Sequence, residues 1–170
     1  LDIFLALVNP GDNVLIPEPY FPLYPPDVEI CGGSPNLYPC RFENGFVPTL
    51  EDLEERVNSS TVAILYNFPS NPTGGNVNPE QRDELVEFAK RNDLWIISDE
   101  VYDRIVYDVP HVSFIGAGYD KVIMVQSFSK TFAMTGWRIG YLLSPDQQAM
   151  EQLTNCLLYT SPSPRDNNRS

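Results

Sequence analysis

Leu94-Trp95-Ile96-Ile97-Ser98 is the stretch that decides the fold, and Asp99-Glu100-Val101-Tyr102 follows it directly. The stretch is apolar at consecutive positions and too short for a buried helix, so it predicts a strand covered on both faces. Strands of this kind belong to parallel sheets with helices on either side. Working outward from it, we predict four more strands, at Val14–Ile16, Val62–Tyr66, Val122–Gln126 and Ile139–Leu143.

Helical segments alternate with these strands. Leu1–Val8 reads as the end of an apolar helix, and Thr49 is placed to cap a helix that runs from Leu50 to about Val57. Asn78 caps and Pro79 begins another helix, and Pro145-Asp146-Gln147 opens the last. The alternation predicts an α/β protein with three layers, α/β/α, around a mostly parallel sheet. Pro17–Pro22 is predicted to be irregular, because each proline removes a backbone donor.

Composition excludes several classes of function. The 170 residues carry a formal net charge of −12, which disfavours binding to nucleic acid or to an anionic membrane surface. No apolar run approaches the roughly 18–20 residues of a membrane span. Three cysteines are too few and too irregularly spaced for a disulfide framework or a zinc site. We therefore expect a cytoplasmic protein with neither membrane nor nucleic-acid partners and no metal.

Polar side chains follow three of the predicted strands, where ligands bind in open α/β sheets. They comprise an amide, a carboxylate, two hydroxyls, an amine and a guanidinium, with a tyrosine nearby: Asn71, Asp99, Ser127, Ser129, Lys130, Arg138 and Tyr102. A lysine beside hydroxyls, an arginine and an aspartate suits Schiff-base chemistry with pyridoxal phosphate. The carboxylate would keep the ring nitrogen protonated. Ser127, Ser129 and Arg138 would suit the phosphate, and Asn71 and a phenol the ring oxygen.

Each residue also has an ordinary structural explanation. Asp99-Glu100 can cap a following helix, Asn71-Pro72-Thr73-Gly74 can be a plain turn, and the tyrosines can be half-buried packing residues. Tyr20 could instead stack on a pyridine ring. The single histidine, His111, lies in a predicted turn and is expected to be solvated. The hypothesis of a pyridoxal-phosphate site therefore depends on the joint occurrence of these residues. It is supported by the two other lysines, Lys90 and Lys121, which are both predicted to be solvated at the surface and so leave Lys130 as the candidate amine.

Three segments in order resemble the class I/II aminotransferases, the fold-type-I pyridoxal-phosphate enzymes of the aspartate aminotransferase group. They are Asn71–Gly74, Ser98–Tyr102 and Ser127-Phe-Ser-Lys130-Thr-Phe-Ala-Met-Thr-Gly-Trp-Arg138-Ile-Gly140. The likeness runs from Leu1 to about Asn155.

The resemblance implies a role for each site residue. Lys130 would bind the cofactor as a Schiff base and shuttle a proton, and Asp99 would pair with the pyridine nitrogen. Asn71 and Tyr102 would contact the ring oxygen, which makes Lys130, Asp99 and Tyr102 the expected catalytic set. Ser127 and Arg138 would bind the phosphate with Ser129 as a helper, and Tyr20 would stack on the ring. The substrates would be an amino acid and a 2-oxo acid, and the assembly a homodimer.

The resemblance also bears on the extent of the domain. We expect residues 1–155 to be part of a large cofactor-binding domain cut at both ends, inactive on its own. Residues 156–170, Cys156-Leu-Leu-Tyr-Thr-Ser-Pro-Ser-Pro-Arg-Asp166 with Asn167–Ser170, resemble a translated sequencing adaptor. We expect them to break the last helix at Cys156. The alternative is a disordered Ser/Pro-rich tail.

Other functions fit parts of this pattern. A carbon–sulfur lyase on the same scaffold, or the aminotransferase-like sensor domain of a transcription regulator, would share most of these residues. Ser127-Phe-Ser-Lys130 also matches the Ser-x-x-Lys pattern of penicillin-binding enzymes. We reject that reading, because the accompanying segments are absent and a buried strand leads into the motif.

Overall fold

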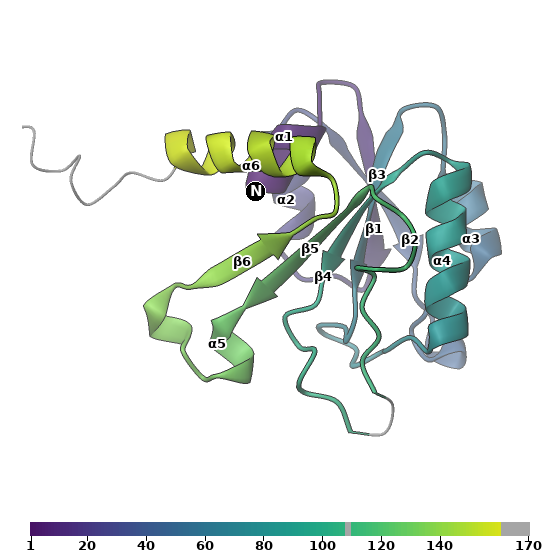
Figure 1. Cartoon of the computed structure of the whole chain (residues 1–170). Helices are drawn as coiled ribbons and strands as arrows, with labels where there is room; N and C mark the ends of the chain where they lie inside the picture. The colour runs from purple at the N-terminus through teal and green to yellow at the C-terminus, as the bar shows by residue number, and fades with distance from the viewer. Residues whose placement is uncertain (108–109, 161–170) are drawn as a thin grey trace, which may run out of the picture.

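The computed structural model describes residues 1–107 and 110–160 (Figure 1). Within this part of the chain the strands form one six-stranded sheet in the order β2-β1-β3-β4-β5-β6. Neighbours from β2 to β5 are parallel, and β6 is antiparallel to β5. The strands are β1 (Asn13–Glu18), β2 (Ser34–Pro39), β3 (Thr61–Asn67), β4 (Trp95–Asp99), β5 (Val122–Ser127) and β6 (Gly140–Leu143).

Helices cover both faces of the sheet (Figure 1). One face carries α3 (Leu50–Arg56) and α4 (Pro79–Arg91), and the other carries α1 (Asp2–Leu7), α2 (Tyr24–Ile30) and α6 (Gln147–Thr160). Short helical turns complete the chain at η1 (Phe42–Asn44), α5 (Phe128–Thr131) and η2 (Thr135–Trp137). The predicted α/β class and the three layers are confirmed.

Two helix starts have the predicted caps. The Asn78 side chain accepts a hydrogen bond from the Gln81 backbone, and Gln81 reciprocates, so α4 begins with a capping box. Thr49 likewise accepts from the Asp52 backbone at the start of α3. The apolar face of α4 then buries Leu85 and Phe88, each of which stabilises the fold by about 1.5–3 kcal/mol.

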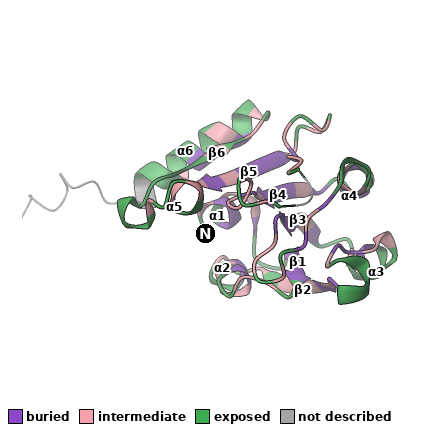
Figure 2. Ribbon diagram, turned by 90° about the horizontal axis from the view of Figure 1, so that it is seen from below, coloured by how far each residue is buried: buried purple, intermediate pink, exposed green. Residues whose placement is uncertain are grey.

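The core lies on both faces of the central strands, which are coloured mostly as buried residues in Figure 2. On the α3–α4 face three rings stack, with the Phe114 centroid 5.0 Å from that of Tyr66 and 6.5 Å from that of Phe68. Phe114 belongs to the connection between β4 and β5, which contains no helix among its described residues. Its buried ring therefore fastens this loop to the sheet.

The proline-rich segment is more regular than predicted, because β1 includes Pro17 and Glu18 and α2 follows at Tyr24. β1 pairs with β3 only as far as Leu15, while its pairing with β2 continues to Glu18. Pro17 therefore lies where one side of the strand has no partner, and its missing N–H costs nothing in the sheet. Pro25 and Pro26 occupy the first turn of α2, where a helix needs no donor.

The expected helix break at Cys156 is wrong. α6 continues through Cys156 to Thr160, because no proline or glycine interrupts the sequence before Pro162. Residues 161–170, with most of the adaptor-like segment, lie outside the described part of the chain. The boundary between a native domain at 1–155 and a non-native tail remains a prediction.

Candidate active site

The ends of three parallel strands lie level at one edge of the sheet. Asn67 at the end of β3 pairs with Asp99 at the end of β4, and Asp99 pairs with Val125 on β5. The loops that leave these strands carry Asn71, Tyr102 and Lys130. The topology therefore gathers the predicted residues at the carboxyl edge, where open α/β sheets bind ligands.

Asp99 points to the α2 side of the sheet. Its Oδ2 accepts a hydrogen bond from the Tyr24 hydroxyl at 2.7 Å, and its Oδ1 accepts one from the Val101 backbone at 3.2 Å. Burial raises the pKa of this carboxyl above its usual range, although both hydrogen bonds act to lower it. Asp99 lines a pocket of about 240 Å³ with mostly apolar neighbours, among them Leu65 and Val125.

Tyr24 is a functional candidate that the sequence reasoning missed. Burial, with a further contribution from the Asp99 charge, raises the pKa of its phenol well above the ordinary value, so Tyr24 is a donor at every physiological pH. The Phe21 ring meets the Tyr24 ring edge-on at 5.5 Å between centroids. The only signal in the sequence was the run of aromatic residues among the prolines after β1.

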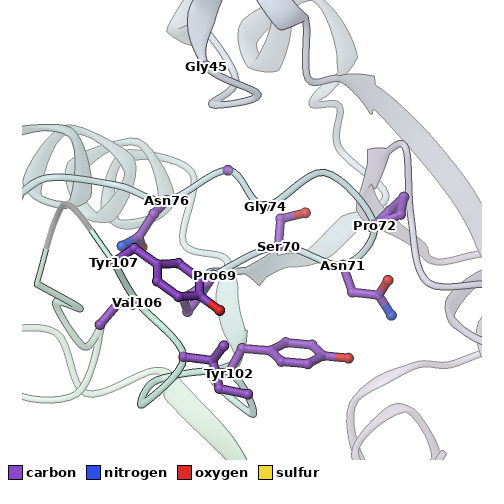
Figure 3. Close-up of a pocket in the computed structure, with 12 residues that line it drawn as sticks. Gly45, Pro69, Ser70, Asn71, Pro72, Gly74, Asn76, Tyr102, Val106 and Tyr107 are labelled. Carbon is purple, nitrogen blue, oxygen red and sulfur yellow. The ribbon is translucent and has the colours of Figure 1, made fainter.

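Asn71 and Tyr102 line a second pocket, of about 540 Å³. Figure 3 shows the Asn71 amide and the Tyr102 ring projecting to the same side of the loop that follows β3. This loop lies tightly against its surroundings, because a Cβ on Gly75 would meet the Gly45 carbonyl oxygen at 2.9 Å. Gly74 has a φ of +75°, which favours glycine. The glycines in this motif thus have a local structural cause.

Lys130 lies on α5 directly after β5. Its Nζ is 5.5 Å from the centroid of the Tyr102 ring, so the amine and the phenol from neighbouring strands approach each other. The Ser127 hydroxyl caps α5 by accepting a hydrogen bond from the Ser129 backbone at 3.1 Å. The other two lysines form surface ion pairs instead, Lys90 with Glu87 and Lys121 with Asp93.

The structure leaves two predicted residues apart from this group. Arg138 is exposed, with Nη1 at 3.3 Å from the Thr135 carbonyl oxygen. Tyr20 is half-buried and packs against the apolar cluster on the α1–α2 face. Within the described residues, no hydrogen bond or ring contact joins either of them to Asp99, Tyr102 or Lys130.

The Glu100 side chain organises a buried polar cluster on the opposite face from Asp99. Its Oε1 accepts hydrogen bonds from Ser98 at 2.9 Å, Ser113 at 2.9 Å and the Phe114 backbone at 3.1 Å. Oε2 lies 2.7 Å from His111 Nε2. Burial raises the pKa of Glu100, but the hydrogen bonds from these partners outweigh it, so the net shift is downward. Glu100 therefore remains ionised inside the protein.

The expectation that His111 is a solvated loop residue is wrong. Its side chain is only 12% exposed, and Glu100 holds it against the end of β4. No local pattern marks this contact, because the position of Glu100 directly after a strand suggested a helix cap, whereas its side chain binds His111 instead. The chain folds back over eleven residues to bring the two together.

The fold and the site define a three-layer α/β protein that carries an amine, a carboxylate and a phenol at the carboxyl edge of a parallel sheet, with the amine over the ring of the phenol. None of the described helices has the length and apolar character needed to cross a membrane. Among the same residues, no group of three or more His, Cys, Asp and Glu side chains is arranged to hold a metal ion.

Comparison with known proteins places this arrangement in a family. The profile described as "Aminotransferase class I and II" matches residues 2–162. The chain is 40% identical over 151 residues to the "Probable aspartate/prephenate aminotransferase" of Aquifex aeolicus, covering 86% of this chain and 38% of the relative. It is 39% identical over 148 residues to the "Aspartate aminotransferase" of Thermotoga maritima, covering 86% of this chain and 39% of the relative.

A comparison with solved structures supports the same family. The aspartate aminotransferase of Thermus thermophilus with maleate superposes with a TM-score of 0.88 at 32% identity, over 94% of this chain and 42% of that one. The chain belongs to the class I and II aminotransferase family. It spans less than half the length of the relatives that it matches.

Proposed function

We propose that the full-length protein containing this chain is a pyridoxal-phosphate-dependent aminotransferase, which moves an amino group between an amino acid and a 2-oxo acid. Family membership supports the reaction class, and members of this family generally depend on pyridoxal phosphate. One observation from the site carries the proposal furthest. Lys130 and Asp99 leave the ends of adjacent parallel strands, with the Tyr102 ring beside the amine.

The residues present fit pyridoxal phosphate. Asp99 is a carboxylate in a largely apolar pocket, which suits a cationic ring nitrogen. Lys130 is exposed, with its amine over an aromatic ring, so it is open to covalent attachment. Asn71 and Tyr102 offer an amide and a phenol on the same side of one pocket, which suits a ring oxygen. When bound, the pyridoxal group supplies an electron sink at the substrate α-carbon.

Each residue then has a distinct part in the reaction. Lys130 would hold the cofactor through its amine, and once the substrate amine displaces it, the freed Nζ would carry a proton between the substrate α-carbon and the cofactor. Asp99 holds a proton on the ring nitrogen, and the Tyr24 hydroxyl keeps the Asp99 carboxylate in place. Asn71 and Tyr102 hydrogen-bond the ring oxygen.

The remaining predicted residues bind the phosphate and the face of the ring. The hydroxyls of Ser127 and Ser129 and the fork of Arg138 bind the phosphate, for which a guanidinium is well suited. Tyr20 stacks on the ring. Because Arg138 and Tyr20 have no described contact with the other site residues, these two assignments rest on the family resemblance.

Absorption spectroscopy of the full-length protein tests the proposal. The purified protein should bind pyridoxal phosphate with a pH-dependent near-ultraviolet or visible band, and an amino acid such as aspartate should convert that band in a single turnover. Lys130→Ala should abolish the band, whereas Lys121→Ala, at a surface ion pair, should retain it. A parent protein without the band, or a Lys130→Ala variant with an unchanged spectrum, would contradict the proposal.

The proposal extends to assembly and location. Aminotransferases are generally dimeric, so we propose a homodimer for the full-length protein and a cytoplasmic location. Sedimentation at several protein concentrations tests the first. A single species with the mass of one full-length polypeptide would contradict it.

A further inference from the structure

Two buried side-chain amides flank the end of β4. Asn67 closes β3 and is 3% exposed, and Gln126 lies near the end of β5 and is 7% exposed. Each sits on a strand that neighbours β4. Neither has a part in the reaction proposed above.

The two amides hold the carbonyl groups of two consecutive residues, Asp99 at the end of β4 and Glu100 directly after it. Asn67 Nδ2 donates to the Asp99 carbonyl oxygen at 3.1 Å, and Gln126 Nε2 donates to the Glu100 carbonyl oxygen at 3.0 Å. The regular pairing of β4 stops at Asp99. The side chains therefore continue the hydrogen-bond ladder at the point where the backbone ladder ends.

Each amide also accepts a hydrogen bond from the backbone of a predicted site residue that follows it in sequence. Asn67 Oδ1 accepts a hydrogen bond from the Asn71 backbone at 2.8 Å, and Gln126 Oε1 accepts one from the Ser127 backbone at 2.8 Å. The acceptor end of each amide thus holds the backbone of a predicted site residue, and the donor end holds a carbonyl group at the end of β4 or directly after it. Because each uses a donor and an acceptor, a carboxylate of the same shape cannot replace either one.

We infer that Asn67 and Gln126 are positioning residues, which fix Asn71 and Ser127 relative to Asp99 by bridging the ends of β3, β4 and β5. The inference rests on the proposed function only for the identity of the ligand that Asn71 and Ser127 bind. The bridging itself follows from the hydrogen bonds described above. A site held by packed, hydrogen-bonded side chains keeps its geometry before any ligand arrives, which lowers the cost of binding.

The test uses the full-length protein with Asn67→Asp and Gln126→Glu. Each variant keeps the shape and the acceptor but replaces the donor with a charged oxygen facing a carbonyl. Asn13→Asp is the matched control, because Asn13 is a buried amide at the opposite end of the sheet, bonded to Asn58 at 3.0 Å. All three lose one buried amide donor, so all three should lower the melting temperature.

The first readout is amide hydrogen exchange in the cofactor-free protein. Peptides that contain Asn71 should exchange faster in Asn67→Asp, and peptides that contain Ser127 should exchange faster in Gln126→Glu. Each rate should rise by about tenfold or more, because losing the buried hydrogen bond to the Asp99 or Glu100 carbonyl oxygen frees the whole side chain, including the acceptor that it presents to the measured backbone N–H. Asn13→Asp should leave both peptides at the parent rate.

The second readout is the affinity for pyridoxal phosphate, which should fall by about tenfold in both site variants and stay within about twofold of the parent in Asn13→Asp. Unchanged exchange and unchanged affinity in the site variants, with a melting temperature lowered as in Asn13→Asp, would overturn the inference. If the parent binds no cofactor, the proposed function fails while the exchange measurement still decides the bridging. If Asn67→Asp does not fold, Gln126→Glu decides the inference.

Discussion

The Tyr24 hydroxyl donates a hydrogen bond of 2.7 Å to the Asp99 carboxylate, across 75 residues of sequence. α2 supplies the donor and β4 the acceptor, so the connection joins a helix of one outer layer to the carboxyl edge of the sheet. A hydrogen bond to a charged group contributes about 1.5–3 kcal/mol to the state that makes it. Tyr24 therefore favours the ionised form of Asp99, the form that the proposed reaction needs.

Tyr24→Phe should impair the reaction more than the fold. Loss of the hydroxyl removes a hydrogen bond to the carboxylate, so the pKa of Asp99 should rise further and the rate of the first half-reaction should fall by about tenfold. Single-turnover absorption kinetics measure this. Tyr38→Phe is the control, because its buried hydroxyl donates to the Leu65 carbonyl oxygen at 2.7 Å on the other face. Equal rates in the two variants would argue against a role for Tyr24.

Asp99→Asn should abolish or strongly reduce activity without destabilising the cofactor-free protein. Burial raises the folded-state pKa of Asp99, so its ionised form costs stability. This cost is complete above the folded-state pKa and shrinks to nothing as the pH falls from there to the unfolded-state pKa of about 3.9. The variant should therefore melt at the same or a higher temperature than the parent at pH 7. Any excess of its melting temperature over that of the parent should disappear in acid. A melting temperature several degrees lower at pH 7 would contradict this.

Glu100→Gln should show the opposite pH dependence. The folded-state pKa of Glu100 is lowered, so its contribution to stability is fully present above the unfolded-state pKa of about 4.3 and is lost as the pH falls through the folded value. At pH 7 the variant should lose about 1–3 kcal/mol of unfolding free energy, because the amide cannot satisfy all four partners. Urea unfolding at pH 7 and at acid pH should show the difference from the parent shrinking. A constant difference would count against an ionised Glu100.

Cys40 should resist thiol reagents until the protein unfolds. Burial raises the pKa of its thiol to about 12, and its side chain lies in the core beside Tyr38 and Tyr66. The thiolate is therefore scarce at pH 8. Labelling of a Cys40→Ala variant in the native state should match that of the parent, while labelling in denaturant should fall by one equivalent. A native-state difference of one equivalent would show that Cys40 is accessible.

Sequence patterns predicted most of the sheet, because its central strands are continuous apolar runs. They missed β2, since Ser34-Pro-Asn-Leu-Tyr-Pro39 lacks such a run and lies at an edge of the described sheet. They also missed α2, because Pro25 and Pro26 resemble breakers although they occupy a first helical turn. Local patterns do not reveal where tertiary packing makes a weak segment regular.

For the site, the sequence predicted the residues that leave the strand ends, because the topology of a parallel sheet brings Asn71, Asp99 and Lys130 to one edge. The supporting residues were not predictable in the same way. Tyr24, Asn67 and His111 act through partners on other elements, and no local spacing marks them. From the sequence alone, these three polar side chains cannot be told apart from ordinary loop residues.

The helix-free connection from β4 to β5 has a consequence for how the molecule opens. Lacking an internal ladder of helical hydrogen bonds, its described residues are held by contacts to other elements. These include the stacked Phe114 ring, the Glu100 cluster, the Arg82 bond to the Ser113 carbonyl oxygen and the Tyr119 bond to the Leu94 carbonyl oxygen. Because side chains make these contacts, local opening of the connection need not disturb the backbone ladder of the sheet. Tyr102 belongs to this connection and Asp99 to β4, so the phenol and the carboxylate of the site are carried by parts of the fold that are held in different ways.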